Sequence, residues 1–132
     1  MKPLLKAFLF LFIIINIGCE NDNDSILIDE SDILIGYWIN PVYSDSGTTF
    51  ERANRFKDDG YGVAFLTENI SLERSSGWCG TPPLIFADFQ GKWKKNDSII
   101  TITIDNGLGG VMDNHWKIKT LDEKHLVIER MP

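Results

Sequence analysis

A two-residue alternation of apolar and polar side chains, repeated in short runs along most of the chain, constrains the fold more than any other feature. In the clearest run, 99–104, Ile100, Ile102 and Ile104 share one side. The same period recurs at 115–119 and 125–129. Successive side chains of a strand point to opposite faces, so this period predicts strands with one buried face. Further strands are predicted at 34–40, 48–56, 61–68 and 86–94.

Turn-forming residues separate these runs, at 58–60, 96–97, 107–110 and 122–123. Such short connections join antiparallel neighbours. No segment after Cys19 carries apolar residues at helical spacing over ten or more positions. The sequence therefore predicts one all-β domain at 33–132, an antiparallel meander of seven to eight short strands that forms a small barrel or a sandwich.

The N-terminal region differs from the rest of the chain. Lys2 and Lys6 precede an apolar stretch at 7–17, and no acidic residue appears before Glu20. The stretch is shorter than the roughly 20 residues that a membrane-spanning helix needs. A positive start followed by a short apolar segment is typical of an export signal.

The segment Asn16-Ile17-Gly18-Cys19 resembles a lipobox, the cleavage site of bacterial lipoprotein precursors. Asn16 departs from the aliphatic residue that is usual at its position. The resemblance implies a signal peptide at 1–18 and a lipid on Cys19 that anchors the protein to a membrane. The alternatives are a plain secretory signal cut elsewhere and an uncleaved anchor.

Residues 20–32 are acidic and polar apart from one short apolar patch, which predicts a solvated tether at 19–32. Cleavage removes two of the 13 basic groups and none of the 19 acidic ones, leaving a formal charge of −8. This charge disfavours nucleic acid and anionic head groups as partners. Membrane attachment would therefore come from the lipid on Cys19. The expected location is the cell envelope, at the outer membrane, on a face that the sequence leaves open.

Two short elements share a Gly-x-Trp pattern, Gly36-Tyr37-Trp38 and Gly91-Lys92-Trp93. A tryptophan two residues after a glycine lies on the same sheet face and can cover the space that the glycine leaves. Together with the meander and the ending at 116–121 and 126–128, this pattern resembles the lipocalin-like domains of many small bacterial lipoproteins. The resemblance covers 33–130. The alternative is a pair of well-packed core tryptophans without a family meaning.

In the family that the chain resembles, the first Gly-x-Trp closes one end of the barrel, and an arginine from a late strand packs over the indole. The resemblance implies this closure for Gly36 and Trp38, with Arg130 as the stacking cation. It also implies a small apolar ligand in the barrel. The alternative is a protein-interaction or structural lipoprotein with a filled barrel, no ligand and an unidentified protein partner. The candidate wall residues are Tyr37, Phe50, Phe65, Phe89 and Trp93.

No catalytic set, metal site or cofactor motif is apparent, so a non-enzymatic protein is expected. His115 and His125 alternate with apolar neighbours and are expected to be solvated. Cys79 is the only thiol left once Cys19 is modified, and it is either buried or exposed in a turn-rich loop. Asp88 alternates with the aromatic residues beside it, which places it on the outer surface or in a polar mouth.

Overall fold

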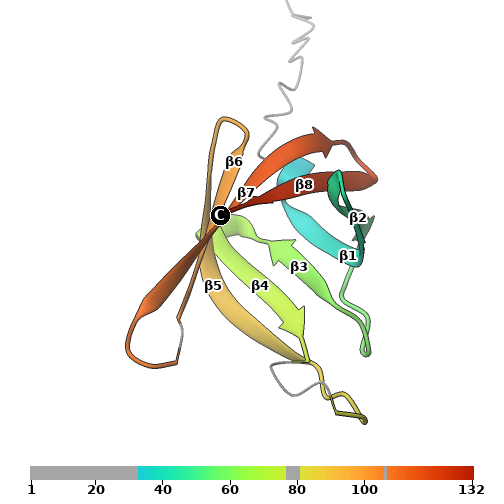
Figure 1. Cartoon of the computed structure of the whole chain (residues 1–132), viewed down its shortest axis with the longest axis vertical. Coiled ribbons are helices and arrows are strands. Elements are labelled where there is room, and N and C mark those ends of the chain that lie inside the picture. Colours follow the sequence, from blue (N-terminus) through green and yellow to red (C-terminus); the bar gives the residue numbers. More distant parts are fainter. Residues whose placement is uncertain (1–32, 77–80, 106) are drawn as a thin grey trace, which may run out of the picture.

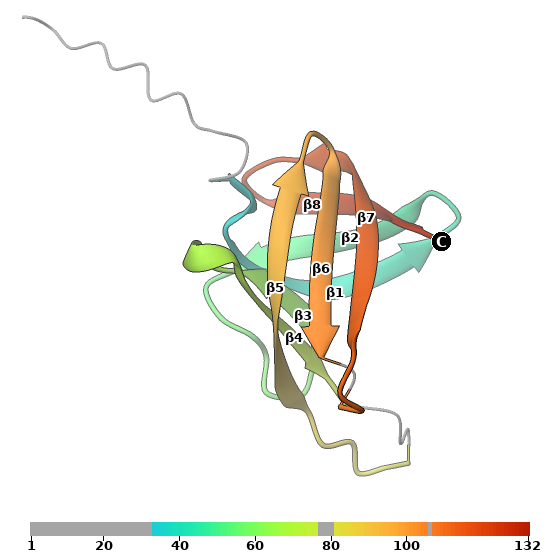
Figure 2. The same ribbon diagram turned by 90° about the vertical axis from the view of Figure 1, so that its left-hand side faces the viewer.

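The computed structural model describes residues 33–76, 81–105 and 107–132. Eight antiparallel strands close into a barrel (Figures 1 and 2), which confirms the predicted all-β class and antiparallel pairing. The strands are β1 (Gly36–Ser44), β2 (Gly47–Ala53), β3 (Gly62–Phe65), β4 (Ile70–Ser75), β5 (Ala87–Asn96), β6 (Ile99–Asp105), β7 (Val111–Leu121) and β8 (His125–Met131). A 3-10 turn, η2 (Thr67–Asn69), joins β3 to β4.

The strand order departs from a strict up-and-down barrel at one point. From β3 to β8 each strand pairs with the next, but β1 lies between β2 and β3, and β2 pairs with β8. The connection from β2 to β3 therefore crosses β1 on the outside of the barrel. Phe56 in this connection packs on Ile39 and Ala64, and its ring meets that of Tyr37 edge-on at 5.0 Å. This outer cluster holds the crossing segment against the sheet.

The barrel interior is filled with apolar side chains over most of its length. The Phe65 ring lies edge-on to those of Trp93 and Trp116, with centroids 5.4 and 6.3 Å apart, and Phe50 stacks on Trp116 at 6.0 Å. An eight-stranded barrel is just wide enough for side chains to fill it. The buried interior set is Leu34, Trp38, Phe50, Val63, Phe65, Trp93, Ile100, Ile102, Trp116, Leu126 and Ile128.

Strand β4 was not predicted, because its polar and apolar faces are reversed. Ser71 and Glu73 face the interior, opposite Phe65 and Val63 of β3. Leu72 faces the outer cluster around Phe56. An alternation with apolar residues outside does not resemble a half-buried strand.

Asp88 lies on the outer face, as one of the two sequence interpretations holds. The Arg74 guanidinium donates two hydrogen bonds to its carboxylate, at 2.6 and 2.9 Å, and these lower the pKa of Asp88. Arg74 also donates to the Lys57 carbonyl at 2.8 Å, and its guanidinium lies over the Phe56 ring. This exposed network ties the crossing segment to β4 and β5.

Candidate functional site

One end of the barrel is closed around Trp38. The indole is fully buried and donates its Nε1 hydrogen to the Leu34 carbonyl at 2.8 Å. Gly36 has a φ of 145°, and a Cβ at that position would lie 2.6 Å from Nη1 of Arg52. The first Gly-x-Trp therefore makes room for a guanidinium beside the indole.

That guanidinium belongs to Arg52 and not to Arg130, so the predicted stacking cation is corrected. The Arg52 Cζ atom lies 4.4 Å from the Trp38 ring centroid. Its two terminal nitrogens donate to the carbonyls of Ile35, at 3.0 Å, and Ile33. Arg52 occupies this position because β2 pairs with β1 and places it directly opposite Trp38. Arg130 instead stands opposite Trp116 on β7.

The second Gly-x-Trp also reflects close packing. A Cβ on Gly91 would lie 2.6 Å from the Thr103 carbonyl oxygen of the neighbouring strand. Trp93 is buried in the core, and its Nε1 hydrogen bonds to the Leu66 carbonyl at 2.9 Å. Both elements are therefore core contacts, and neither lines the open end of the barrel.

The opposite end of the barrel is a half-open mouth. It holds a pocket of about 330 Å³ whose floor is the edge of the aromatic core at Trp116. A smaller pocket of about 40 Å³ shares Glu73, Trp116 and Arg130 with it and extends toward Tyr43 and Phe50. The lining of the larger pocket is Glu73, Ile104, Met112, Asn114, His115, Trp116, Arg130 and Met131. This mixture of apolar walls and a few polar groups is the usual composition of a small-molecule site.

Glu73 brings a carboxyl group into this mouth. Its strand places it between the interior positions of Val63 on β3 and Phe89 on β5. Burial raises the pKa of the Glu73 carboxyl above its ordinary value, and the positive charge of Arg130 opposes part of that rise. A positively charged or hydrogen-bonding group placed beside this carboxyl would therefore stabilise its charged form.

Arg130 brings a guanidinium into the same mouth from β8. Its Cζ atom lies 5.5 Å from the Trp116 ring centroid and 5.7 Å from that of Tyr43. Two aromatic rings beside one guanidinium restrict its orientation. Within the described part of the chain, no hydrogen bond or ion pair joins the side chain of Arg130, Glu73 or Asn114 to another protein group.

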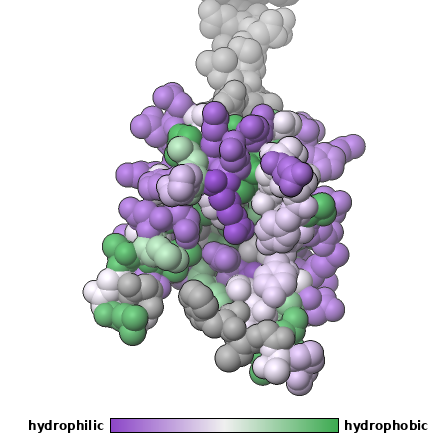
Figure 3. All heavy atoms as spheres, viewed as in Figure 1, coloured by the Kyte–Doolittle hydropathy of each residue, from purple (hydrophilic) through white to green (hydrophobic). Residues whose placement is uncertain are grey.

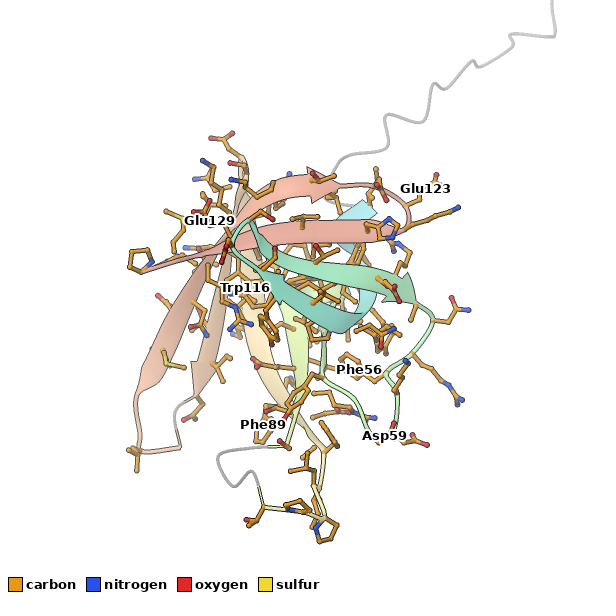
Figure 4. All side chains as sticks on the ribbon, turned by 45° about the vertical axis from the view of Figure 1, so that its right-hand side comes forward. Phe56, Asp59, Phe89, Trp116, Glu123 and Glu129 are labelled. Atoms are coloured by element: carbon orange, nitrogen blue, oxygen red, sulfur yellow. The ribbon has the colours of Figure 1, made fainter. Side chains whose placement is uncertain are left out.

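The aromatic residues predicted as pocket walls lie elsewhere. Phe50, Phe65 and Trp93 belong to the filled core, and only Phe50 reaches the smaller pocket. Tyr37 is on the outer face, where it packs on Phe56, because it alternates with the inward-facing Trp38. Phe89 is 46% exposed and lies near the mouth opposite Glu73 (Figure 4), but it lines neither pocket.

The residues that do line the mouth gave weak signals in the sequence. Met112, Asn114 and Trp116 alternate on one face of β7, so extending the predicted strand at 115–119 toward its N-terminus would have found the first two. Glu73 lay on the unpredicted strand β4. Arg130 was singled out, but for the other end of the barrel.

Exposed apolar residues gather on the loops at the lower end of the molecule. Figure 3 shows them as two green patches below a mainly hydrophilic surface. They lie at 81–86, at 107–110 and at Val111, the first residue of β7. These described segments lie at the lower end of the molecule in Figure 2. The most exposed are Ile85, Leu108 and Val111.

The remaining predicted groups form no further site. His115 is exposed, and its Nδ1 lies 3.1 Å from the Thr101 hydroxyl, while His125 is 3.8 Å from Asp122. Among the residues that the structure describes, no three histidine, cysteine, aspartate or glutamate side chains are placed to hold a metal ion. No helix in this described part is long and apolar enough to cross a membrane. Cys19 and Cys79 lie outside the described residues.

Comparison with known proteins gives no assignment by similarity. No protein-family model, curated protein or solved structure matches this chain. What the geometry establishes is a small antiparallel β-barrel, closed around Trp38 at one end and open at the other over a buried aromatic cluster.

Proposed function

We propose that this chain is a membrane-anchored lipoprotein with a lipocalin-like barrel that binds a small molecule in its mouth and catalyses no reaction. The observation that carries the proposal is the half-open pocket of about 330 Å³ with two unpaired charged groups above an aromatic floor. Glu73 is half-buried and Arg130 is exposed. Proteins rarely leave a partly buried charged group such as Glu73 without a partner unless a ligand or water completes it. The mouth is therefore the place where binding is expected.

A second candidate is a protein-interaction module. It is favoured by the filled interior, which leaves no deep cup, and by the exposed side chains of Ile85, Leu108 and Val111 near the mouth. Exposed apolar patches of this kind mark interaction sites in soluble proteins. The two candidates differ in what occupies the mouth, and a variant that fills it separates them.

Replacing Asn114 with tryptophan is expected to abolish small-molecule binding while the barrel stays folded. Asn114 is half-buried and faces the interior opposite Ile102, so an indole there would occupy the pocket. Native mass spectrometry of the purified full chain in a non-ionic detergent is the measurement. The wild-type protein is expected to carry a small-molecule adduct that the variant has lost.

The matched control is Asp113→Trp, which puts the same side chain on the outer face of the same strand, where Asp113 accepts a hydrogen bond from the Thr103 hydroxyl. This control should retain the adduct. Equal adducts in all three proteins would place the ligand elsewhere. Their absence from all three, with a co-purifying protein lost on replacing Ile85 by serine, would favour the interaction module.

The anchor is tested separately at Cys19. A Cys19→Ala precursor expressed in a bacterial host is expected to lose incorporation of labelled palmitate, because the thiol that receives the lipid is absent. The barrel should still fold, since its strands and its buried core are built from residues 34–131. Cys79→Ala serves as the control and should keep its label. Persistent labelling of the Cys19 variant would overturn the assignment.

A further inference from the structure

Two opposite charges face each other across the barrel mouth without touching. Glu73 lies on β4 and Arg130 on β8, and these strands are four positions apart in both directions around the closed barrel. They therefore stand on opposite walls of one pocket. No ion pair within 4.0 Å links the two side chains.

Resting on the proposed binding function, we infer that the mouth takes a small zwitterion, a free amino acid with an apolar side chain. Its ammonium group would bind the Glu73 carboxylate, and its carboxylate would bind the Arg130 guanidinium. A ligand with both charges satisfies both walls at once, which a singly charged ligand does not. It also gives a partner to Glu73, the half-buried member of the two charges, while pairing the exposed guanidinium of Arg130.

The guanidinium suits a carboxylate in particular. The rings of Trp116 and Tyr43 lie near its planar group, with centroids 5.5 and 5.7 Å from Cζ. Its N–H groups have no protein acceptor in the described residues, so they are free to hold both carboxylate oxygens. A restricted guanidinium loses little freedom when it forms such a pair.

The carboxyl of Glu73 suits an ammonium group for a similar reason. Burial disfavours its negative charge, and Arg130 is too distant to form a direct pair. A ligand cation placed next to it would remove this cost. Val63 and Phe89, its cross-strand neighbours, offer no competing charge.

Apart from Asn114 and His115, the rest of the pocket lining is apolar, and the pocket is small. Ile104 and Met112 form one side, and the Trp116 indole forms the floor. The volume of about 330 Å³ is at the lower limit for small-molecule sites, which fits a single amino acid better than a lipid. Asn114 adds an amide that can donate to the ligand carboxylate or accept from its ammonium group.

Three ligands with the same aromatic side chain test the inference. L-Phenylalanine carries both charges, 3-phenylpropanoate lacks the amine, and 2-phenylethylamine lacks the carboxylate. Binding to the purified full chain in a non-ionic detergent is followed by intrinsic tryptophan fluorescence and by calorimetry. L-Phenylalanine is expected to bind at least about tenfold more tightly than either analogue, because each analogue leaves one protein charge unpaired.

Two variants assign the charges to their residues. Glu73→Gln should weaken the binding of L-phenylalanine and of 2-phenylethylamine by about tenfold or more and leave the binding of 3-phenylpropanoate unchanged. Arg130→Met should do the reverse: it should weaken the binding of L-phenylalanine and 3-phenylpropanoate and leave the binding of 2-phenylethylamine unchanged. The spared ligand reports that each variant is folded. Glu129→Gln, on the outer face beside Arg130 (Figure 4), and the exposed Arg55→Met are the matched controls and should bind as the wild type does.

The outcomes separate the inference from the function on which it rests. If either analogue binds as tightly as L-phenylalanine, the inference that the ligand is a zwitterion is overturned, while small-molecule binding in the mouth stands. If none of the three ligands binds but native mass spectrometry shows another adduct lost in Asn114→Trp, the ligand class is wrong and the function is kept. No binding and no adduct would overturn both.

Discussion

Replacing Trp38 with alanine is expected to lower the free energy of unfolding by about 3–5 kcal/mol, the usual loss for a fully buried tryptophan. The side chain is 0% exposed, closes one end of the barrel and hydrogen bonds to the Leu34 carbonyl. Its removal leaves a cavity, an unpaired carbonyl and an uncovered arginine. Urea unfolding followed by circular dichroism measures the loss.

Two further variants keep this test interpretable. Trp38→Phe retains most of the ring but not the hydrogen bond, so it should lose less than the alanine variant. Tyr43→Ala removes a ring that is 65% exposed at the mouth and should lose less than about 1 kcal/mol. A Trp38→Ala protein as stable as the Tyr43 variant would contradict the closure of the barrel by this residue.

Replacing Arg52 with methionine is expected to lower the free energy of unfolding by about 2–4 kcal/mol. The side chain donates from two nitrogens to the Ile33 and Ile35 carbonyls and covers the Trp38 indole. Hydrogen bonds from a charged donor contribute about 1.5–3 kcal/mol each. Its Nε is buried without a partner, which offsets part of this gain and sets the estimate below the sum.

Arg130→Met is the matched comparison for Arg52→Met. The Arg130 guanidinium is near two rings but has no hydrogen bond to the described residues, so the loss should stay within about 1 kcal/mol. The same urea measurement applies. A larger loss of unfolding free energy for Arg130→Met than for Arg52→Met would indicate that Arg130, and not Arg52, stabilises the closed end of the barrel.

The three most clearly predicted strands share a physical property. Each buries one face and exposes the other, so the two-residue period is evident in its sequence. These strands are β6, the C-terminal half of β7, and β8. β4 was missed because Glu73 and two serines face inward, while Leu72 faces a cluster created by the β2–β3 connection. Local pattern does not reveal which face a later segment will cover.

The candidate site was predicted less well than the fold. The sequence indicated that Gly36 leaves space beside Trp38. Which side chain fills that space depends on which strand pairs with β1, and it is Arg52 of β2. That pairing is a long-range property with no signature in the local residues. The mouth was missed for a related reason. Glu and Asn are also common on solvated surfaces, so the sequence does not show that Glu73 and Asn114 face the inside of the barrel.

The pairing of β2 with β8 has a consequence for the folding of the barrel. Every strand has at least one partner close to it in sequence, but the β2–β8 pairing joins the first hairpin to the last strand of the barrel. Until β8 has joined the sheet, β2 and β7 each present an unpaired edge, the kind of surface that recruits strands from other molecules. Loss of only the final strand would therefore leave an aggregation-prone sheet with two open edges, although most of the core residues would still be present.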